Sequence, residues 1–223
     1  MLAILSDSSN SNHVLCRVGF GGGTRFNAQR RIAEAATTLA QAMLSEPGGR
    51  WLFPDPVEFV DLHEAIFMRT MTRALEEGLV GAWGDPFVGV AVWVEQPSIG
   101  WESRESERSP VPPLALPEHA AARVEEFDKL LRLMRKRARP DHHLYLDSIG
   151  VLRDHRHRGI ASALVESGLA RADVRGLPCS LDTLDSSNID FYRRRGFKVV
   201  ASEPLADSGL TLTSMRRVAP SAS

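Results

Sequence analysis

The residues best suited to chemistry lie between positions 144 and 161, where the sequence reads LYLDSIGVLRDHRHRGIA. A predicted β-strand ends at Val151, and a loop rich in arginine and histidine follows it. Gly159 then stands at the start of a predicted helix, whose first backbone N–H groups have no partner within the helix and carry partial positive charge. This combination predicts a site for a pyrophosphate group, because glycine lets the anion approach the backbone closely.

Purely structural roles for these residues are the alternative to this prediction. Gly159 could serve only for packing, and the arginine and histidine run from 153 to 158 could be a solvated turn. A second glycine run, at 21–23, has neither a lysine nor the GxGxxG spacing of nucleotide-binding loops, so we interpret it as a connector. The candidate anion site is therefore the segment around Gly159.

Other clusters of histidine and arginine raise the question of metal or nucleic-acid binding, and their spacing supports neither. The pairs His142–His143 and His155–His157 have no acidic or cysteine partner at a ligand spacing, and we predict no metal site. The run Arg193–Arg195 is typical of cations that end a helix, where the dipole favours them. We interpret it in that way and predict no nucleic-acid partner.

Two motifs occur together and in a fixed order. The segment RHRGIA at 156–161 follows a predicted strand, opens a predicted helix and matches the R/Q-x-x-G-x-G/A signature of the GNAT acetyltransferases. Downstream, Asn188 and the segment FYRRRGF at 191–197 resemble the second motif of that family. The sequence thus resembles the GNAT superfamily over most of residues 14–217 and, within it, the puromycin N-acetyltransferase type. The resemblance to that type rests on residues 88–93, 144–163 and 188–197.

The resemblance implies a fold and a reaction. The fold is α/β (α+β), the GNAT fold: a mixed, mostly antiparallel central sheet with helices on both faces and a splayed parallel strand pair. The reaction is transfer of the acetyl group of acetyl-CoA, the acyl donor, to the primary amine of a small molecule by direct attack in a ternary complex. A protein or peptide amine is an alternative acceptor, and a non-catalytic acyl-CoA sensor is an alternative function.

The resemblance also places the donor. The pantetheine arm would run along the signature strand and pair with its backbone as an extra strand does. The pyrophosphate would lie over the backbone N–H groups of the loop and the first helical turn. Asn188 would hydrogen-bond the arm, although by itself this residue also fits a helix N-cap. The predicted cofactor-binding residues are Ile149, Gly150, Val151, Arg156, His157, Arg158, Gly159, Ile160, Ala161, Asn188 and Tyr192.

Two residues are predicted to move protons. Tyr192 lies one helical turn after Asn188, so both face one side, and the resemblance implies that its phenol protonates the departing thiolate. The alternative for Tyr192 is a core tyrosine. Asp147 is the candidate base, because strand alternation puts it on the face of Ile149 and Val151. A structural salt bridge explains Asp147 equally well.

The remaining pattern predicts the elements that hold these residues. Glu64 and His63 lie on a predicted helix that Pro56 opens and Gly78 ends, and we interpret both as solvated. Two stretches rich in Val, Trp and Phe flank Asp85-Pro86 and predict an antiparallel hairpin. The other predicted helices begin near Asn27 and cover 118–137, 159–175 and 188–195; the other predicted strands are 14–20, 143–151, 179–184, 197–201 and 209–217.

Composition narrows the class of protein. The chain has 223 residues, of which 43% are hydrophobic and 25% charged, which is typical of a globular domain and excludes a disordered or collagen-like chain. Its 27 basic and 28 acidic residues give a net charge of -1, so nucleic-acid or anionic-membrane binding has no global electrostatic support. Cys16 and Cys179 stand alone and favour a reducing compartment, and the apolar run 1–5 is too short for a signal peptide.

We therefore predict a cytoplasmic protein without a membrane span. The predicted domain division is a flexible tail at 1–12, a single acetyltransferase domain at 13–217 with a long mobile loop at 96–117, and a C-terminal tail at 218–223. The sequence does not decide between a monomer and a homodimer.

Overall fold

The computed structural model describes residues 13–16, 25–96, 116–138 and 142–219. Its strands are β1 (His13–Cys16), β2 (Gly78–Trp83), β3 (Gly89–Gln96), β4 (His143–Val151), β5 (Cys179–Thr183), β6 (Lys198–Leu205) and β7 (Leu210–Arg217). Its helices are α1 (Arg25–Met43), α2 (Pro47–Leu52), α3 (Pro56–Glu77), α5 (Glu118–Ala138), α6 (Ile160–Val174) and α7 (Ile189–Arg193), with short 3-10 turns η1 (Arg153–His155), η2 (Ser186–Asn188) and η3 (Ala206–Ser208). The predicted tail at 1–12, positions 97–115 of the predicted loop and positions 220–223 lie outside the described residues.

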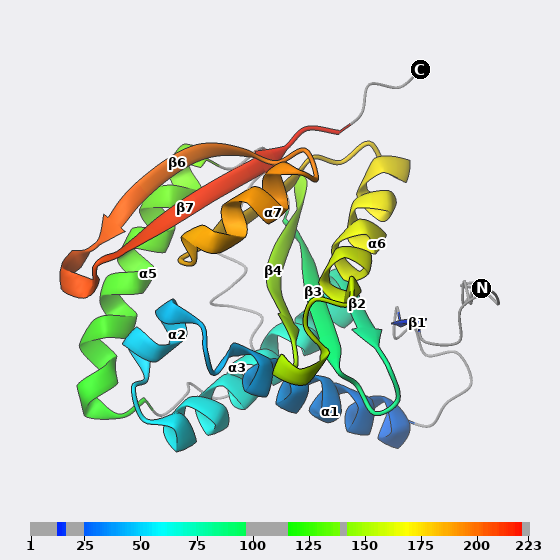
Figure 1. Cartoon of the computed structure of the whole chain (residues 1–223), viewed down its shortest axis with the longest axis horizontal. Coiled ribbons are helices and arrows are strands. Elements are labelled where there is room, and N and C mark those ends of the chain that lie inside the picture. Colours follow the sequence, from blue (N-terminus) through cyan, green and yellow to red (C-terminus); the bar gives the residue numbers. More distant parts are fainter. Residues whose placement is uncertain (1–12, 17–24, 97–115, 139–141, 220–223) are drawn as a thin grey trace.

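The described strands form one sheet in the order β1-β2-β3-β4-β5-β7-β6 (Figure 1). β4 and β5 pair in parallel, and every other neighbouring pair in this described sheet is antiparallel. A parallel pair needs a crossover connection, which α6 supplies between β4 and β5. The structure confirms the predicted mixed, mostly antiparallel sheet.

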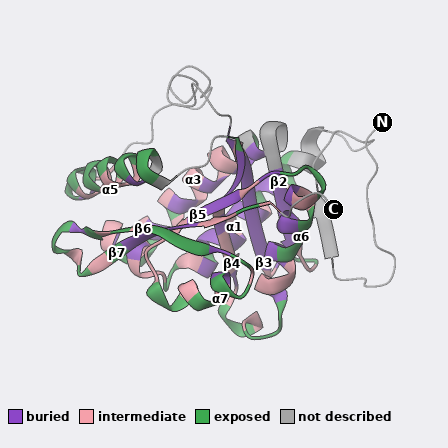
Figure 2. Cartoon of the chain, turned by 90° about the horizontal axis from the view of Figure 1, so that it is seen from above, coloured by how far each residue is buried: buried purple, intermediate pink, exposed green. Residues whose placement is uncertain are grey.

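Helices cover both faces of this sheet (Figure 2). On one face, α6 and α7 enclose a core around the fully buried Trp93 of β3. Gly168 lets α6 lie directly on Trp93, because a Cβ at this position would lie 2.2 Å from the Trp93 ring. On the other face, α1 and α3 bury Leu39 and Met71 against apolar residues of β2 and β3. The apolar faces of the helices predicted from the sequence thus pack into two separate cores, one on each face of the sheet.

Local capping sets the ends of the helices that were predicted from the sequence. α3 begins after Asp55, whose Oδ1 accepts hydrogen bonds from the backbone N–H groups of Val57 (2.8 Å) and Glu58 (3.1 Å). Pro56 occupies its first position, where the missing N–H costs nothing. α6 ends before Gly176, which has a φ of 63° and is in the left-handed conformation that terminates many helices.

Two elements differ from the sequence prediction by more than a shift of an end by one or two residues within the described part of the chain. α2 was not predicted, because its sequence PGGRWL contains two glycines and little periodicity. β6 continues to Leu205, four residues beyond the predicted end, and includes Pro204. A proline is tolerated there because β6 is the outermost strand of the described sheet. α5 packs against β6 and β7 (Figure 1). Arg137 of α5 forms an ion pair with Glu203 of β6. No helix in the described part of the chain is long and apolar enough to cross a bilayer.

Candidate active site

The two parallel strands separate near the middle of the sheet. β4 and β5 pair over only three residues each, from Leu144 with Cys179 to Leu146 with Leu181. β4 then continues along β3 to Val151 without a partner residue on β5. Backbone groups on that side of β4 are therefore available to an extended ligand. The predicted splayed parallel pair is confirmed.

The separation begins at a β-bulge. Val92 of β3 pairs with Ser148 and its neighbour Trp93 pairs with Leu146, so Asp147 is the extra residue of the bulge on β4. The bulge also interrupts the strict alternation of side chains. The alternation that predicted Asp147 on the face of Ile149 and Val151 is interrupted at this residue, so alternation alone does not place its side chain. Leu144 and Leu146 contact the same core cluster as Ile149 and Val151, and strict alternation cannot give that result.

A loop shaped for an anion follows β4, where the sequence predicted one. Gly159 has a φ of 80° and forms the N-cap of α6 without a side-chain capping bond. His157, two residues earlier, also has a positive φ of 60°. A Cβ built on Gly159 meets no atom within 4 Å, so the space above the first turn of α6 is open. Backbone N–H groups of Ile160 and Ala161 belong to this first turn, which the helix itself cannot satisfy. These features fit a pyrophosphate group.

The two arginines of the loop have different environments. The guanidinium of Arg156 donates to the carbonyl oxygens of Val151 (3.1 Å) and Ala42 (2.7 Å) and to the hydroxyl of Ser45 (3.2 Å). It thereby ties the end of α1 to the end of β4. Arg158 is exposed and donates to the backbone carbonyl of Asp154 at 3.0 Å.

Glycine at position 150 is required by the close packing of α1 on β4. A Cβ at this position would lie 2.7 Å from the Cβ of Ala42 and 2.9 Å from Cδ1 of Leu39. Glycine therefore lets α1 lie directly against β4. Ile149 and Val151, the other predicted strand residues of the site, pack into the opposite core. Any contact of these three residues with a pantetheine arm would be made by their backbone.

Asn188 and Asp185 lie together after β5. Asp185 accepts hydrogen bonds from the backbone N–H of Ser187 (2.9 Å) and from Nδ2 of Asn188 (3.4 Å). The backbone of Asn188 is at the N-cap of α7, but its side chain makes no capping bond. The side chain is half-buried, and Asn188 ends the short turn η2 that follows β5.

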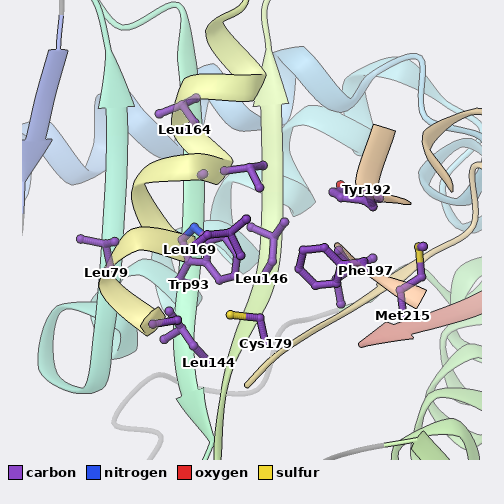
Figure 3. Close-up of a cluster of buried hydrophobic side chains, with 14 of the residues drawn as sticks. Leu79, Trp93, Leu144, Leu146, Leu164, Leu169, Cys179, Tyr192, Phe197 and Met215 are labelled. Atoms are coloured by element: carbon purple, nitrogen blue, oxygen red, sulfur yellow. The ribbon is translucent and has the colours of Figure 1, made fainter. Parts of the chain in front are cut away.

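Tyr192 is 6% exposed and lies beside Phe197 in the core that α7 covers (Figure 3). Its ring makes edge contacts with Phe191 at a centroid distance of 5.2 Å and with Phe197 at 6.0 Å. Burial raises the pKa of the Tyr192 phenol above its ordinary value, the negative charges of Glu46 and Asp185 raise it further, and Arg195 opposes this shift. The phenol therefore keeps its proton at neutral pH.

Glu46 is a residue of this site that sequence reasoning missed. It stands between α1 and α2, and burial together with the charge of Asp185 raises the pKa of its carboxyl, while Arg156 opposes the shift. The same carboxylate acts electrostatically on Tyr192, which is 146 positions away by subtraction of the residue numbers. No motif surrounds Glu46. The signal available in the sequence was a lone acid before Pro47 at the end of a predicted helix, which is equally common on a surface.

His63 and Glu64 of α3 lie in different environments. His63 is 8% exposed, so its predicted solvation is wrong. Its ring stacks on Phe59 at a centroid distance of 3.8 Å, and Nδ1 lies 2.8 Å from the carbonyl oxygen of Phe59. Burial lowers the pKa of His63, which keeps this ring neutral. Glu64 is half-buried and accepts a hydrogen bond from Thr37 of α1. The hydrogen bonds and ring contacts described for these two side chains join them to Thr37 of α1, to Phe59 and Phe67 of α3 and to Phe53.

The family model that matches this chain is the acetyltransferase (GNAT) family, over residues 51–197. The match spans both strands of the splayed pair, the loop before α6 and the whole of α7. The chain belongs to the GNAT acetyltransferase family. It is accordingly an acyltransferase that uses acetyl-CoA as donor, and the loop at 156–161 and the free edge of β4 have the form this donor requires.

Solved structures agree in fold. A Corynebacterium glutamicum protein described as histone acetyltransferase HPA2 and related acetyltransferase superposes with a TM-score of 0.58 at 19% identity, covering 90% of this chain and 96% of that one. Arylalkylamine N-acetyltransferase 2 from Aedes aegypti superposes with a TM-score of 0.57 at 14% identity, covering 86% and 95%. At these identities the likeness shows the shared GNAT fold.

Proposed function

We propose that this GNAT enzyme acetylates the primary amine of a small molecule by direct attack in a ternary complex. The observation that carries the proposal is the end of β4–β5 pairing at Leu146 and Leu181, with an open anion loop at the far end of β4. A donor with its pyrophosphate at that loop and its arm along β4 would bring the thioester toward the end of β5. Asn188 and Tyr192 lie there.

Each predicted donor-binding residue has a role in this proposal. Backbone groups of Ile149, Gly150 and Val151 pair with the pantetheine arm. The backbone of residues 156–161 binds the pyrophosphate, and Arg158 adds positive charge at the exposed side. Arg156 acts indirectly, because its guanidinium holds the loop against α1. Asn188 turns its amide toward the arm once the 3.4 Å contact with Asp185 is exchanged.

The reaction requires that a neutral amine attack the thioester carbonyl. The oxyanion that forms would be stabilised by backbone donors beside the splayed pair, and collapse expels the CoA thiolate. Tyr192 is the proposed acid for that thiolate, since its raised pKa keeps the proton available at neutral pH. Asp147 is close to the bulge and accepts a hydrogen bond from the Ser148 hydroxyl at 2.7 Å, and it is one candidate for the base.

The choice of a small-molecule acceptor rests on the puromycin N-acetyltransferase resemblance in segments 88–93, 144–163 and 188–197. The fold neighbours named above are of two kinds by their descriptions, one histone-related and one for arylalkylamines. A protein or peptide amine is therefore the second candidate. A sensor without turnover is disfavoured by Tyr192, because donor binding alone needs no proton donor.

The test is calorimetric titration of the purified protein with acetyl-CoA and with CoA, followed by a thiol-release assay. The assay offers puromycin, tryptamine, spermidine and a lysine-containing peptide as acceptors. Binding of acetyl-CoA with thiol release that depends on a small amine supports the proposal. Release with the peptide alone favours a protein acceptor, and binding without any release favours the sensor.

A further inference from the structure

The junction between α1 and α2 lies across the opening between β4 and β5. On one side, Arg156 binds the carbonyl of Ala42 and the hydroxyl of Ser45, and this guanidinium also holds the last carbonyl of β4. On the other side, Gly48 packs so tightly on Leu184, the first residue after β5, that a Cβ would lie 2.3 Å from its Cδ1. Glu46 stands between these two contacts.

The carboxylate of Glu46 has no structural task among the described residues. Glu46 is the N-cap residue of α2, yet its side chain makes no capping hydrogen bond. It forms none of the salt bridges found in the described part of the chain, and Arg156 directs its hydrogen bonds to backbone and hydroxyl oxygens. A half-buried acid without a capping or pairing role is costly for the fold, which suggests another use for it.

The charged and titratable groups that face Glu46 come from three elements. They are the phenol of Tyr192 on α7, the carboxylate of Asp185 after β5, and the guanidinium of Arg156 before α6. Burial disfavours ionisation of the Glu46 carboxyl, the charge of Asp185 disfavours it further, and the charge of Arg156 favours it. The carboxyl of Glu46 therefore has a pKa moved upward, toward the range in which it can both take and release a proton.

We propose that Glu46, on the α1–α2 junction held between Arg156 and Leu184, takes the proton of the acceptor amine. The inference rests on the function proposed above. Asp147 is then a residue of the bulge, where the Ser148 hydroxyl holds it. The two proposed proton-transfer groups are 146 positions apart in the chain, yet the charge of Glu46 acts on the Tyr192 phenol.

The proposed transfer conserves protons from the ammonium substrate to the products. The amine enters as an ammonium ion, and the Glu46 carboxylate takes one proton, which frees the nitrogen lone pair. The C–N bond forms, and the tetrahedral intermediate collapses with cleavage of the C–S bond. Tyr192 gives its phenol proton to the thiolate and is reprotonated by the second proton that leaves nitrogen. The protonated Glu46 finally returns its proton to solvent, so amide, CoA thiol and one released proton result.

The experiment compares Glu46→Gln with the wild type across pH 5 to 9, on whichever of the four amines above gives the fastest thiol release. Gln keeps the shape of the side chain and removes its basicity, so kcat/KM at neutral pH should fall about 100-fold or more. The acidic limb of the pH profile should disappear. The affinity for acetyl-CoA by calorimetry should stay within about twofold, which also shows that the variant is folded. Glu46→Asp should retain the limb at reduced rate.

Matched variants separate this role from a general loss of charge. Glu125→Gln removes one carboxylate from an exposed position on α5 and should leave rate and profile unchanged. Asp147→Asn tests the rival base. If Glu46→Gln keeps its rate and its acidic limb while the wild type is active, the inference is overturned. If Asp147→Asn alone removes the limb, the inference is overturned as well. A wild type that releases thiol with none of the amines contradicts the proposed function, and this inference with it.

Discussion

The guanidinium of Arg156 donates a 2.7 Å hydrogen bond to the carbonyl oxygen of Ala42, and so joins the last turn of α1 to the loop that precedes α6. The same side chain also binds the carbonyl of Val151 at 3.1 Å. One arginine thus holds the end of β4, the anion loop and the α1–α2 junction in one arrangement. The junction carries Glu46, so the position of this acid depends on a residue of the donor-binding signature.

Replacing Arg156 by alanine should destabilise the protein by about 2 kcal/mol, because its hydrogen bonds to two backbone carbonyls involve a charged donor. The Arg156→Lys variant should recover little of the stability lost in the alanine variant, since an ammonium group cannot reach two separated carbonyls as a planar guanidinium does. Urea denaturation measures both. Arg153→Ala, an exposed change in the same loop, serves as the control and should shift the free energy of unfolding by less than about 0.5 kcal/mol. Equal effects of Arg153 and Arg156 would argue against the tie.

Placing a glutamate at Gly159 should abolish acetyl-CoA binding, because a negative side chain would enter the space predicted for the pyrophosphate. Gly176 offers a matched control at the opposite end of α6. It also has positive φ, 63° against 80° at Gly159, and also meets no atom within 4 Å of an added Cβ. Gly176→Glu should therefore show similar backbone strain with normal affinity. Calorimetry that finds equal affinities in both variants would refute the predicted anion site.

Removing the Tyr192 hydroxyl should lower kcat by about 100-fold and leave the affinity for acetyl-CoA nearly unchanged. Tyr145→Phe is the matched control, because both tyrosines of the chain are 6% exposed. The Tyr145 hydroxyl donates to Asp182 at 3.0 Å, so its loss should cost about 1 kcal/mol of stability without a comparable loss of rate. Kinetics and calorimetry on one preparation of each variant decide the matter. Unchanged turnover in Tyr192→Phe would exclude this phenol as the acid.

Glu46→Gln should stabilise the protein at neutral pH. The carboxyl of Glu46 has a raised pKa in the folded state, so above the ordinary glutamate pKa the folded protein binds more protons than the unfolded chain. Stability therefore falls as pH rises through that window, and the glutamine variant lacks this loss. The urea midpoint of the variant should exceed that of the wild type at pH 7 and approach it at pH 4. A midpoint difference that grows toward low pH would contradict the direction of the shift.

The sequence predicted β4 with its observed bounds, the helix that follows Gly159, and the short helix that carries Tyr192. These segments are defined by local signals, because strand alternation, a glycine N-cap and a helical repeat act between residues close in the chain. The bulge at Asp147 could not be read in this way, since it depends on how β4 registers against β3. The burial of His63 likewise depends on Phe53, Phe59 and Phe67, which enclose its ring.

The sequence by itself determined the family motifs and the parallel pair around α6, and it predicted the residues that bind the donor. Only the tertiary structure decided that the charge of Glu46 acts on Tyr192 and that Arg156 binds the carbonyl oxygens of Val151 and Ala42. Arg156 and Ala42 are 114 positions apart, and no local propensity relates residues at that distance. Their contact exists because two cores pack α1 and α7 against opposite faces of one sheet, which brings the α1–α2 junction to the point where β4 and β5 separate.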